Sequence, residues 1–360
     1  MERNKPTVIS TFAGCGGSIL GYRSAGFEDL LAVEFEEDAV STLRANFPDM
    51  AVHDGDIREL TPERCMELAG VKAGELTVLD GSPPCQGFSL AGARDVNDER
   101  SQLYNDFARL LEGIRPKAFV VENVTGMVSG KLQYVFVQMM ERLRGAGYLA
   151  KAQVLNSMYF GVPQRRRRLI VVGIRDDLGI EPSHPKPQTG PITFGEACMD
   201  LRGDGPDDRP LIPFVRWVAR KQPRAWTTKS DLYAKIKGNT AGSYNLVWAD
   251  WDRVCGTIVA LETNTTGVVH PDRRRYISLA EARRIGGFPD DFIFTDRRMG
   301  IKRIGNSVPP PLMGAIAAHI KEALSGGDKS QGKGKASGGK AKSPRKAAKA
   351  KGAAKDKAPA

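Results

Sequence analysis

The sequence lacks any long hydrophobic run. No segment approaches the roughly 18 consecutive apolar residues of a membrane-spanning helix, and the N-terminal MERNKPTVIS has no apolar stretch of the kind found in secretory signals. We therefore expect a cytoplasmic protein without membrane contact. With 360 residues, 41 % of them apolar, the chain is long enough for one large domain and a second lobe.

Cysteine is also scarce. The chain has five cysteines, an odd number, and none of them pairs as CxxC: Cys15, Cys65, Cys85, Cys198 and Cys255. Wide and irregular spacing argues against both a disulfide framework and a zinc site. A cysteine with a special role would act alone.

The last 34 residues contain no Leu, Ile, Val or aromatic residue. From Gly327 to Ala360 there are ten Lys, one Arg and two Asp, so this tail carries +9 of the net charge of +11. A segment of this composition cannot bury a core, and we expect it to be disordered. It is either a solubilising extension or a loose clamp on nucleic acid; its lysine density favours the clamp.

The first 175 residues alternate short apolar runs with amphipathic stretches of helical length. The apolar runs are TVISTF, LLAVEF, LTVLD, KAFVVENV and RLIVVGI. This pattern predicts an α/β fold, with a mostly parallel sheet and helices on both faces. Such sheets bind ligands at the carboxyl ends of their strands. A short strand before HDGDI would be the third, which makes LTVLD the fourth. The places to search are therefore FAGCGG after the first strand, Glu34 closing the second, GSPPCQ after the fourth, and ENV closing the fifth.

Regular patterning stops near Glu181 and returns close to the end. Residues 182–255 are rich in Pro, Gly, Asp, Arg and Trp without a clear period, whereas SLAEARRIGGF and PPPLMGAIAAHIKEAL are again helical in pattern. We expect a sheet domain over 1–181, a second lobe over 182–272, a return to the first domain over 273–326, and the tail over 327–360.

FAGCGG is a strand-to-helix turn that would let the backbone approach a ligand closely. It fails the dinucleotide fingerprint G-x-G-x-x-G because Ile19 stands at the third glycine. Twenty residues after Gly14, Glu34 could accept hydrogen bonds from ribose hydroxyls, and Asp56 could bind an adenine amino group. Each acid alone could be a solvated loop residue. Together they suit S-adenosylmethionine better than NAD.

Cys85 follows an apolar strand behind Pro83 and Pro84. A lone cysteine is more often a small buried hydrophobe than a nucleophile. At the carboxyl end of a strand, however, the two prolines would hold its thiol in one position. Glu122 of ENV closes the next strand, so a thiol and a carboxyl could face one ligand.

QRRRR begins the strand RLIVVGI. Alternation places Arg166 and Arg168 on one face and Arg165 and Arg167 on the other. Such a run is commonly a solvated or phosphate-binding face, but one pair could line a pocket.

Taken together, the motifs resemble those of the DNA (cytosine-5) methyltransferase family. Eight sequence features occur in that family's order and approximate spacing, over about residues 7 to 320 except 182–255. They are FAGCGG, Glu34, GDI, PPCQGFS, ENV, FGVPQRRRR, GGFPDDF and GNSVPPP. The resemblance implies a Rossmann-like S-adenosylmethionine-dependent methyltransferase fold with a smaller, irregular target-recognition lobe. It also implies duplex DNA as the substrate, with the target cytosine flipped out of the helix.

The resemblance further implies catalytic roles. Cys85 would add to C6 of cytosine, which makes C5 nucleophilic toward the methyl group. Glu122 would hold the N3 edge and support proton transfer, and Asn123 would orient the loop. Arg166 and Arg168 would position the base carbonyl and neighbouring phosphates, with Gln164 in support.

Residues of the cofactor site follow from the same resemblance. Phe12 would lie against adenine, Glu34 would bind the ribose, and Asp56 with Ile57 would bind the adenine edge. The remaining residues of this site are Gly14, Gly16, Gly17, Phe35, Pro84, Leu103, Asn306 and Val308. Two places depart from the family pattern: Ser10 replaces an acid, and Leu279, Ala280, Glu281 and Gly286 stand in an altered late motif.

Three other functions stay open on the sequence. A tRNA cytosine-5 methyltransferase shares the catalytic motifs, a catalytically silent DNA-binding protein would share the shape, and a dehydrogenase would need the missing glycine. A companion restriction endonuclease is common for such enzymes. A monomer is the default expectation.

Overall fold

The structure is a computed structural model that describes residues 4–84, 103–201, 209–213, 215–216, 245–263 and 266–330. Cys85 lies outside the described residues, as do much of the expected recognition lobe and residues 331–360 of the tail. Within the described ranges, no helix is both long enough and apolar enough to cross a membrane.

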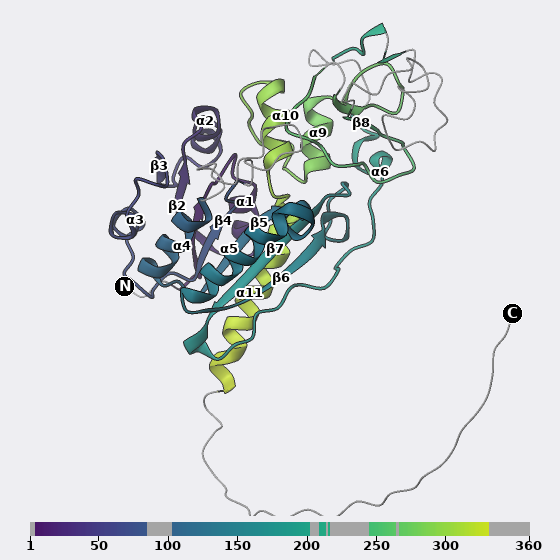
Figure 1. Cartoon of the computed structure of the whole chain (residues 1–360). Coiled ribbons are helices and arrows are strands. Elements are labelled where there is room, and N and C mark those ends of the chain that lie inside the picture. Colours follow the sequence, from purple (N-terminus) through teal and green to yellow (C-terminus); the bar gives the residue numbers. More distant parts are fainter. Residues whose placement is uncertain are drawn as a thin grey trace, which may run out of the picture.

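A seven-stranded sheet forms the centre of the described chain (Figure 1). The order across the sheet is β3-β2-β1-β4-β5-β7-β6. The first five strands in this order are parallel, and β7 runs antiparallel to both of its neighbours. The strands are β1 (Thr7–Thr11), β2 (Glu28–Glu34), β3 (Val52–Asp54), β4 (Val78–Gly81), β5 (Ala118–Val124), β6 (Tyr148–Asn156) and β7 (Arg167–Arg175). The predicted α/β architecture is confirmed.

The helices alternate with the strands in the first half and are consecutive at the end. They are α1 (Gly17–Ser24), α2 (Glu37–Asn46), α3 (Pro62–Ala69), α4 (Leu103–Ile114), α5 (Gln133–Gly145), α6 (Phe194–Cys198), α9 (Leu279–Gly286), α10 (Arg297–Asn306) and α11 (Pro310–Ser330). Local sequence signals set several ends. Thr61 caps α3 through its hydroxyl, and Ser278 forms a reciprocal capping box with Glu281 at α9.

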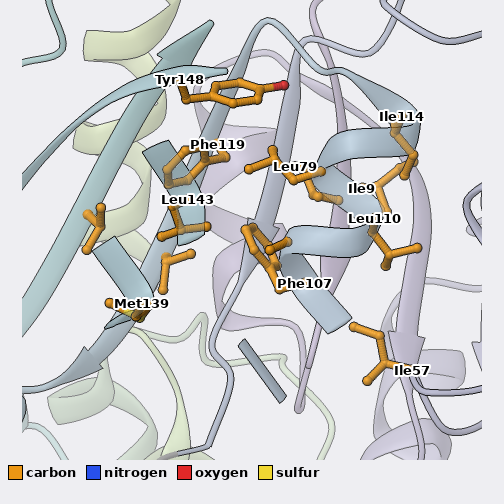
Figure 2. Close-up of a cluster of buried hydrophobic side chains, with 14 of the residues drawn as sticks. Ile9, Ile57, Leu79, Phe107, Leu110, Ile114, Phe119, Met139, Leu143 and Tyr148 are labelled. Carbon is orange, nitrogen blue, oxygen red and sulfur yellow. The ribbon is translucent and has the colours of Figure 1, made fainter. Parts of the chain in front are cut away.

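One face of the sheet is covered by α4 and α5. Phe107 and Leu110 of α4 and Leu143 of α5 pack against Leu79 and Phe119 of the strands, and Figure 2 shows this cluster. In α4 the buried residues 107, 108, 110, 111 and 114 follow helical spacing, so a single stripe faces the sheet.

The opposite face is covered by α1 and α11. Leu312 and Ile316 of α11 lie in one cluster with Val8, Val78 and Val120 of the strands. The last helix thus packs on the face of the sheet that contains Val8 of the first strand. This helix continues through Ser330, past the expected start of the tail at residue 327.

A further cluster joins the start of the chain to its later part. Cys15, Ile19 and Phe47 pack with buried apolar residues of α6, α9 and α10, among them Phe194 and Ile304. Figure 1 shows α6, α9, α10 and β8 (Asn245–Trp248) grouped at the upper right. There β8 pairs in parallel with β9 (Thr266–Val269). The domain boundaries themselves stay predictions.

Candidate active site

The FAGCGG turn runs from the end of β1 into α1 with an unusual backbone. Phe12 has φ 51°, a left-handed conformation that strains a non-glycine residue, and Gly14 and Gly16 have φ 56° and 91°. Strain of this kind costs on the order of 1–3 kcal/mol and concentrates at functional sites. A Cβ on Gly14 would meet nothing within 4 Å, so this side of the turn is open.

Gly17 brings two distant motifs together. A Cβ on Gly17 would lie 1.9 Å from Oγ of Ser307 and 2.5 Å from the carbonyl oxygen of Val308. Only glycine permits this approach, so the start of α1 touches GNSVPPP. Val308 is buried there, whereas Asn306 at the end of α10 is exposed.

Glu34 is a buried carboxylate at the carboxyl end of β2. Gly14 N donates to its Oε2 at 2.7 Å, and the amides of Phe35 and Glu36 donate to its Oε1 at 2.9 Å each. A carboxylate has about four acceptor sites, so Oε2 still has capacity for a hydroxyl. The neighbouring Phe35 is 65 % exposed, an unusual state for a large apolar ring.

Asp56 lies two residues after β3. Its carboxylate pairs with Arg58, whose Nε and Nη2 lie 2.9 and 2.6 Å from Oδ2. The hydrogen bond from Arg58 lowers the pKa of Asp56, so this group is an ionised acceptor at neutral pH. Ile57 is buried in the same cluster against which Phe12 and Leu103 pack. Three residues that the resemblance assigned to the cofactor site thus belong to, or pack against, one extended hydrophobic cluster.

Glu122 of β5 and Arg168 of β7 form a buried ion pair. Arg168 Nε lies 2.8 Å from Glu122 Oε1, and the two side chains are 14 % and 8 % exposed. They stand on adjacent strands, β7 and β5, where Val124 is paired with Arg168 and Glu122 with Ile170. The pair fixes the carboxyl group at the carboxyl end of β5.

Asn123 connects the end of β5 to the proline turn that follows β4. Its Nδ2 donates to the carbonyl oxygen of Pro83 at 3.1 Å, and its Oδ1 accepts from Val124 N at 2.8 Å. Pro84, partly buried, is the last described residue before position 85. The hydrogen bond therefore connects the ENV motif to the turn at Pro83.

Arg166 and Gln164 contact protein backbone. Arg166 is 1 % exposed; its Nη1 and Nη2 donate to the carbonyl oxygens of Ile258 and Gly305 at 3.2 and 2.8 Å. Burial lowers its pKa to about 9. Gln164 Nε2 donates to Ile285 O at 3.2 Å, and Gln164 Oε1 accepts from Ile258 N at 3.1 Å. Both side chains connect the segment that leads into β7 to later parts of the chain, a role that the sequence motif did not reveal.

The alternation predicted for QRRRR is confirmed. Arg166 is buried and Arg168 is mostly buried, whereas Arg165 and Arg167 are exposed.

The altered late motif contains a buried ionic cluster. Arg275 donates to both oxygens of Glu281, at 2.7 and 3.0 Å, and His270 Nε2 lies 3.1 Å from Oε1. Burial alone would raise the pKa of Glu281, but the bonds from His270 and Arg275 bring it to about 2. The Glu281 carboxylate is therefore ionised and holds His270 and Arg275 together in a structural ionic cluster.

Comparisons with known proteins identify relatives of this chain. The sequence profile described as C-5 cytosine-specific DNA methylase matches residues 6–322. The chain is 31 % identical over 368 residues to the type II methyltransferase M.XorII of Xanthomonas oryzae, covering 89 % of this chain and 85 % of that protein. It is 32 % identical over 357 residues to the type II methyltransferase M.NgoPII of Neisseria gonorrhoeae, covering 90 % and 99 %.

A solved structure gives the same result. A protein described as a DNA modification methyltransferase encoded within an E. coli prophage superposes with a TM-score of 0.70 at 26 % identity, over 89 % of this chain and all of that one. The family profile spans nearly all of the described fold. The chain belongs to the C-5 cytosine-specific DNA methylase family.

Proposed function

We propose that the protein transfers a methyl group from S-adenosylmethionine to C5 of a flipped cytosine in a specific sequence of duplex DNA. One observation carries the proposal furthest: Asn123 bonds to Pro83, so Glu122 and the turn before Cys85 belong to one rigid unit. A thiol and a carboxyl group from neighbouring strands can then face the same base.

Cys85 acts as the nucleophile in this proposal. Its thiolate adds to C6, and the ring becomes electron-rich at C5. Glu122 binds the N3 edge and supplies a proton there, so negative charge does not build up on the ring. After C5 has taken the methyl group, loss of the C5 proton, release of the Cys85 thiolate and return of the N3 proton to Glu122 restore the aromatic base. A stacked base cannot present C5 and C6 in this way, so flipping is required.

Arg168 and Arg166 have separate parts. Arg168 holds the Glu122 carboxyl group through one oxygen and can present its remaining donors to the base carbonyl. Arg166 and Gln164 bond to backbone groups of later segments and hold the chain in place where it enters β7.

Residues around the FAGCGG turn fit S-adenosylmethionine. Glu34 offers acceptor capacity for ribose, the exposed Phe35 offers an apolar surface, and Gly14 leaves room above the turn. Phe12, Asp56, Ile57 and Leu103 would surround the adenine. When bound, this cofactor supplies an electrophilic methyl group on its sulfonium sulfur.

We further propose a recognition role for the lobe that begins near residue 182, and a loose DNA clamp for the tail. Removal of residues 331–360 should weaken duplex binding and flatten its salt dependence, because fewer lysines would displace counterions. Unchanged affinity and slope would leave the tail as a solubilising extension. A companion endonuclease and a monomeric state belong to the same proposal.

The experiment that tests the function uses labelled S-adenosylmethionine with duplex DNA and with tRNA. We expect label in DNA, at C5 of cytosine, and bisulfite sequencing would give the target sequence. Label in tRNA alone would show that the protein is a tRNA cytosine-5 methyltransferase. Absence of label from both nucleic acids would contradict the proposal.

A further inference from the structure

Helix α10 carries a buried arginine that contacts the segment after β2. Arg303 is 3 % exposed. Its Nε donates to Asp38 Oδ2 at 2.7 Å, its Nη2 donates to Glu36 Oε2 at 2.6 Å, and it also contacts Asp38 Oδ1. Lys302 Nζ reaches Glu36 Oε2 at 2.5 Å. Two cations of α10 therefore hold two carboxylates at the start of α2.

One of these carboxylates belongs to Glu36, whose backbone N–H also bonds to the Glu34 carboxylate. Glu36 is the N-cap residue of α2, but its side chain makes no capping bond and turns to Arg303 instead. Its backbone N–H donates to Glu34 Oε1 at 2.9 Å. The position of Glu36 thus sets one of the amides that orient the Glu34 carboxylate, and Arg303 sets the position of Glu36.

The helix that carries Arg303 is fixed at both ends. At its start, Arg297 bonds to both oxygens of Glu262, at 2.5 and 3.1 Å. At its end, Gly305 O accepts from Arg166 at 2.8 Å. A Cβ on Gly305 would come within 2.4 Å of Ala260 N, so the helix end is tightly enclosed. The position of Arg303 is therefore set by the contacts of α10, and Arg303 in turn positions the loop after β2.

We propose that Arg303 is a positioning residue for cofactor binding, which acts through Glu36 to hold the Glu34 carboxylate in its binding orientation. The proposal rests on the proposed S-adenosylmethionine site. Without the guanidinium, Asp38 would lose its two close contacts with Arg303, and Glu36 would keep only its contact with Lys302. A single lysine then balances two neighbouring carboxylates, so their mutual repulsion would shift Glu36 from its present position. The amide of Glu36 would move as well.

The test compares Arg303→Met with Arg284→Met. Arg284 also holds two carboxylates, bonding to Asp290 at 2.8 and 2.6 Å and to Asp200 at 2.5 Å, but this cluster involves no residue of the Glu34 loop. Titration calorimetry with S-adenosylhomocysteine, at a temperature where both variants are folded, should give a Kd raised about tenfold for Arg303→Met. The Kd of Arg284→Met should stay within twofold of the wild type.

Steady-state kinetics and a conservative variant separate positioning from simple loss of stability. Arg303→Met should raise KM for S-adenosylmethionine while kcat stays within twofold. Arg303→Lys keeps one cationic contact and should restore part of the affinity; it also serves if the methionine variant does not fold. A lowered Tm with an unchanged Kd in either Arg303 variant would overturn the proposal. Failure of the wild type to bind S-adenosylhomocysteine would instead contradict the cofactor assignment.

Discussion

Arg168 Nε lies 2.8 Å from Oε1 of Glu122, and this ion pair is almost completely enclosed by the protein. A carboxyl group held through one oxygen keeps its second oxygen for a ligand. The same pair restrains the position of Oε1. The geometry suits a group that must meet one edge of a base in one orientation.

Glu122→Gln should abolish most of the activity. Glutamine keeps the size of the side chain and can accept from Arg168, but it cannot supply a proton to N3. We expect kcat to fall by roughly 10²–10⁴, with the Kd for S-adenosylhomocysteine unchanged. Glu112→Gln is the matched control, since Glu112 pairs with Arg142 on the surface of α4. A rate for Glu122→Gln within threefold of the wild type would exclude Glu122 as the proton donor.

Asn123→Ala tests the connection between ENV and the proline turn. The variant leaves the Pro83 carbonyl without its partner, which costs about 1–3 kcal/mol when the group stays buried. The single-turnover rate of methyl transfer should therefore fall between about fivefold and a hundredfold.

The control for this variant is Asn46→Ala. Asn46 bridges to Ile293 through both its Nδ2 and its Oδ1, a similar amide link outside the site. Its loss should leave the single-turnover rate unchanged. Equal rates for the two variants would mean that the Asn123 link does not position the nucleophile.

The predicted order of strands and helices was largely right because apolar runs and amphipathic stretches are local signals. The sequence did not predict β6, since YLAKAQVLN mixes apolar and charged residues. In the structure it is an edge strand with several exposed side chains, so burial imposes no simple pattern on it. Helix α10 was also not predicted, because RRMGIKRIGN buries arginine and glycine at the positions where apolar residues would signal a helix.

The candidate site was only partly predictable for a related reason. The motifs located Glu122, Asn123 and Glu34 at strand ends, where the structure places them. Arg166 looked identical to Arg168 in the sequence, and only tertiary contacts separate the arginine that holds Glu122 from the one enclosed by carbonyl groups. The Arg303 contacts join residues more than 260 positions apart, a distance over which a single sequence carries no local signal.

Gly17→Ala tests the contact between α1 and GNSVPPP. The new Cβ would collide with Ser307 and with the backbone of Val308, and overpacking of this kind costs about 1–3 kcal/mol. Tm should fall by several degrees and S-adenosylhomocysteine should bind more weakly. Gly145→Ala, at the end of α5, meets nothing within 4 Å and should leave both unchanged. Indistinguishable variants would show that the close approach at Gly17 is absent in solution.

Asp80 makes a prediction about pH. This carboxyl group on β4 is buried and accepts from Tyr22 at 3.4 Å, and burial raises its pKa to about 7. The folded protein therefore binds this proton more tightly than the unfolded chain does. The free energy of unfolding should fall as pH rises from about 4 to 7, and stay low above that range.

Asp80→Asn should remove this pH dependence. Asparagine carries no charge at either pH. The free energy of unfolding of the variant, relative to that of the wild type, should therefore increase by about 3 kcal/mol between pH 5 and pH 8. Urea unfolding at the two pH values gives the comparison, and Asp29, whose pKa burial raises to about 6, is present in both proteins. A constant difference between the proteins would mean that Asp80 is ionised throughout.

The most direct measurement of the central claim uses a duplex with 5-fluorocytosine at the target position. Fluorine cannot leave C5 as a proton does, so the bond between Cys85 and C6 should persist and give a slower band on a denaturing gel. The wild type should form this adduct in the presence of S-adenosylmethionine, and Cys85→Ser should form none while still binding S-adenosylhomocysteine. An undiminished adduct, or 5-methylcytosine made by Cys85→Ser, would contradict the account.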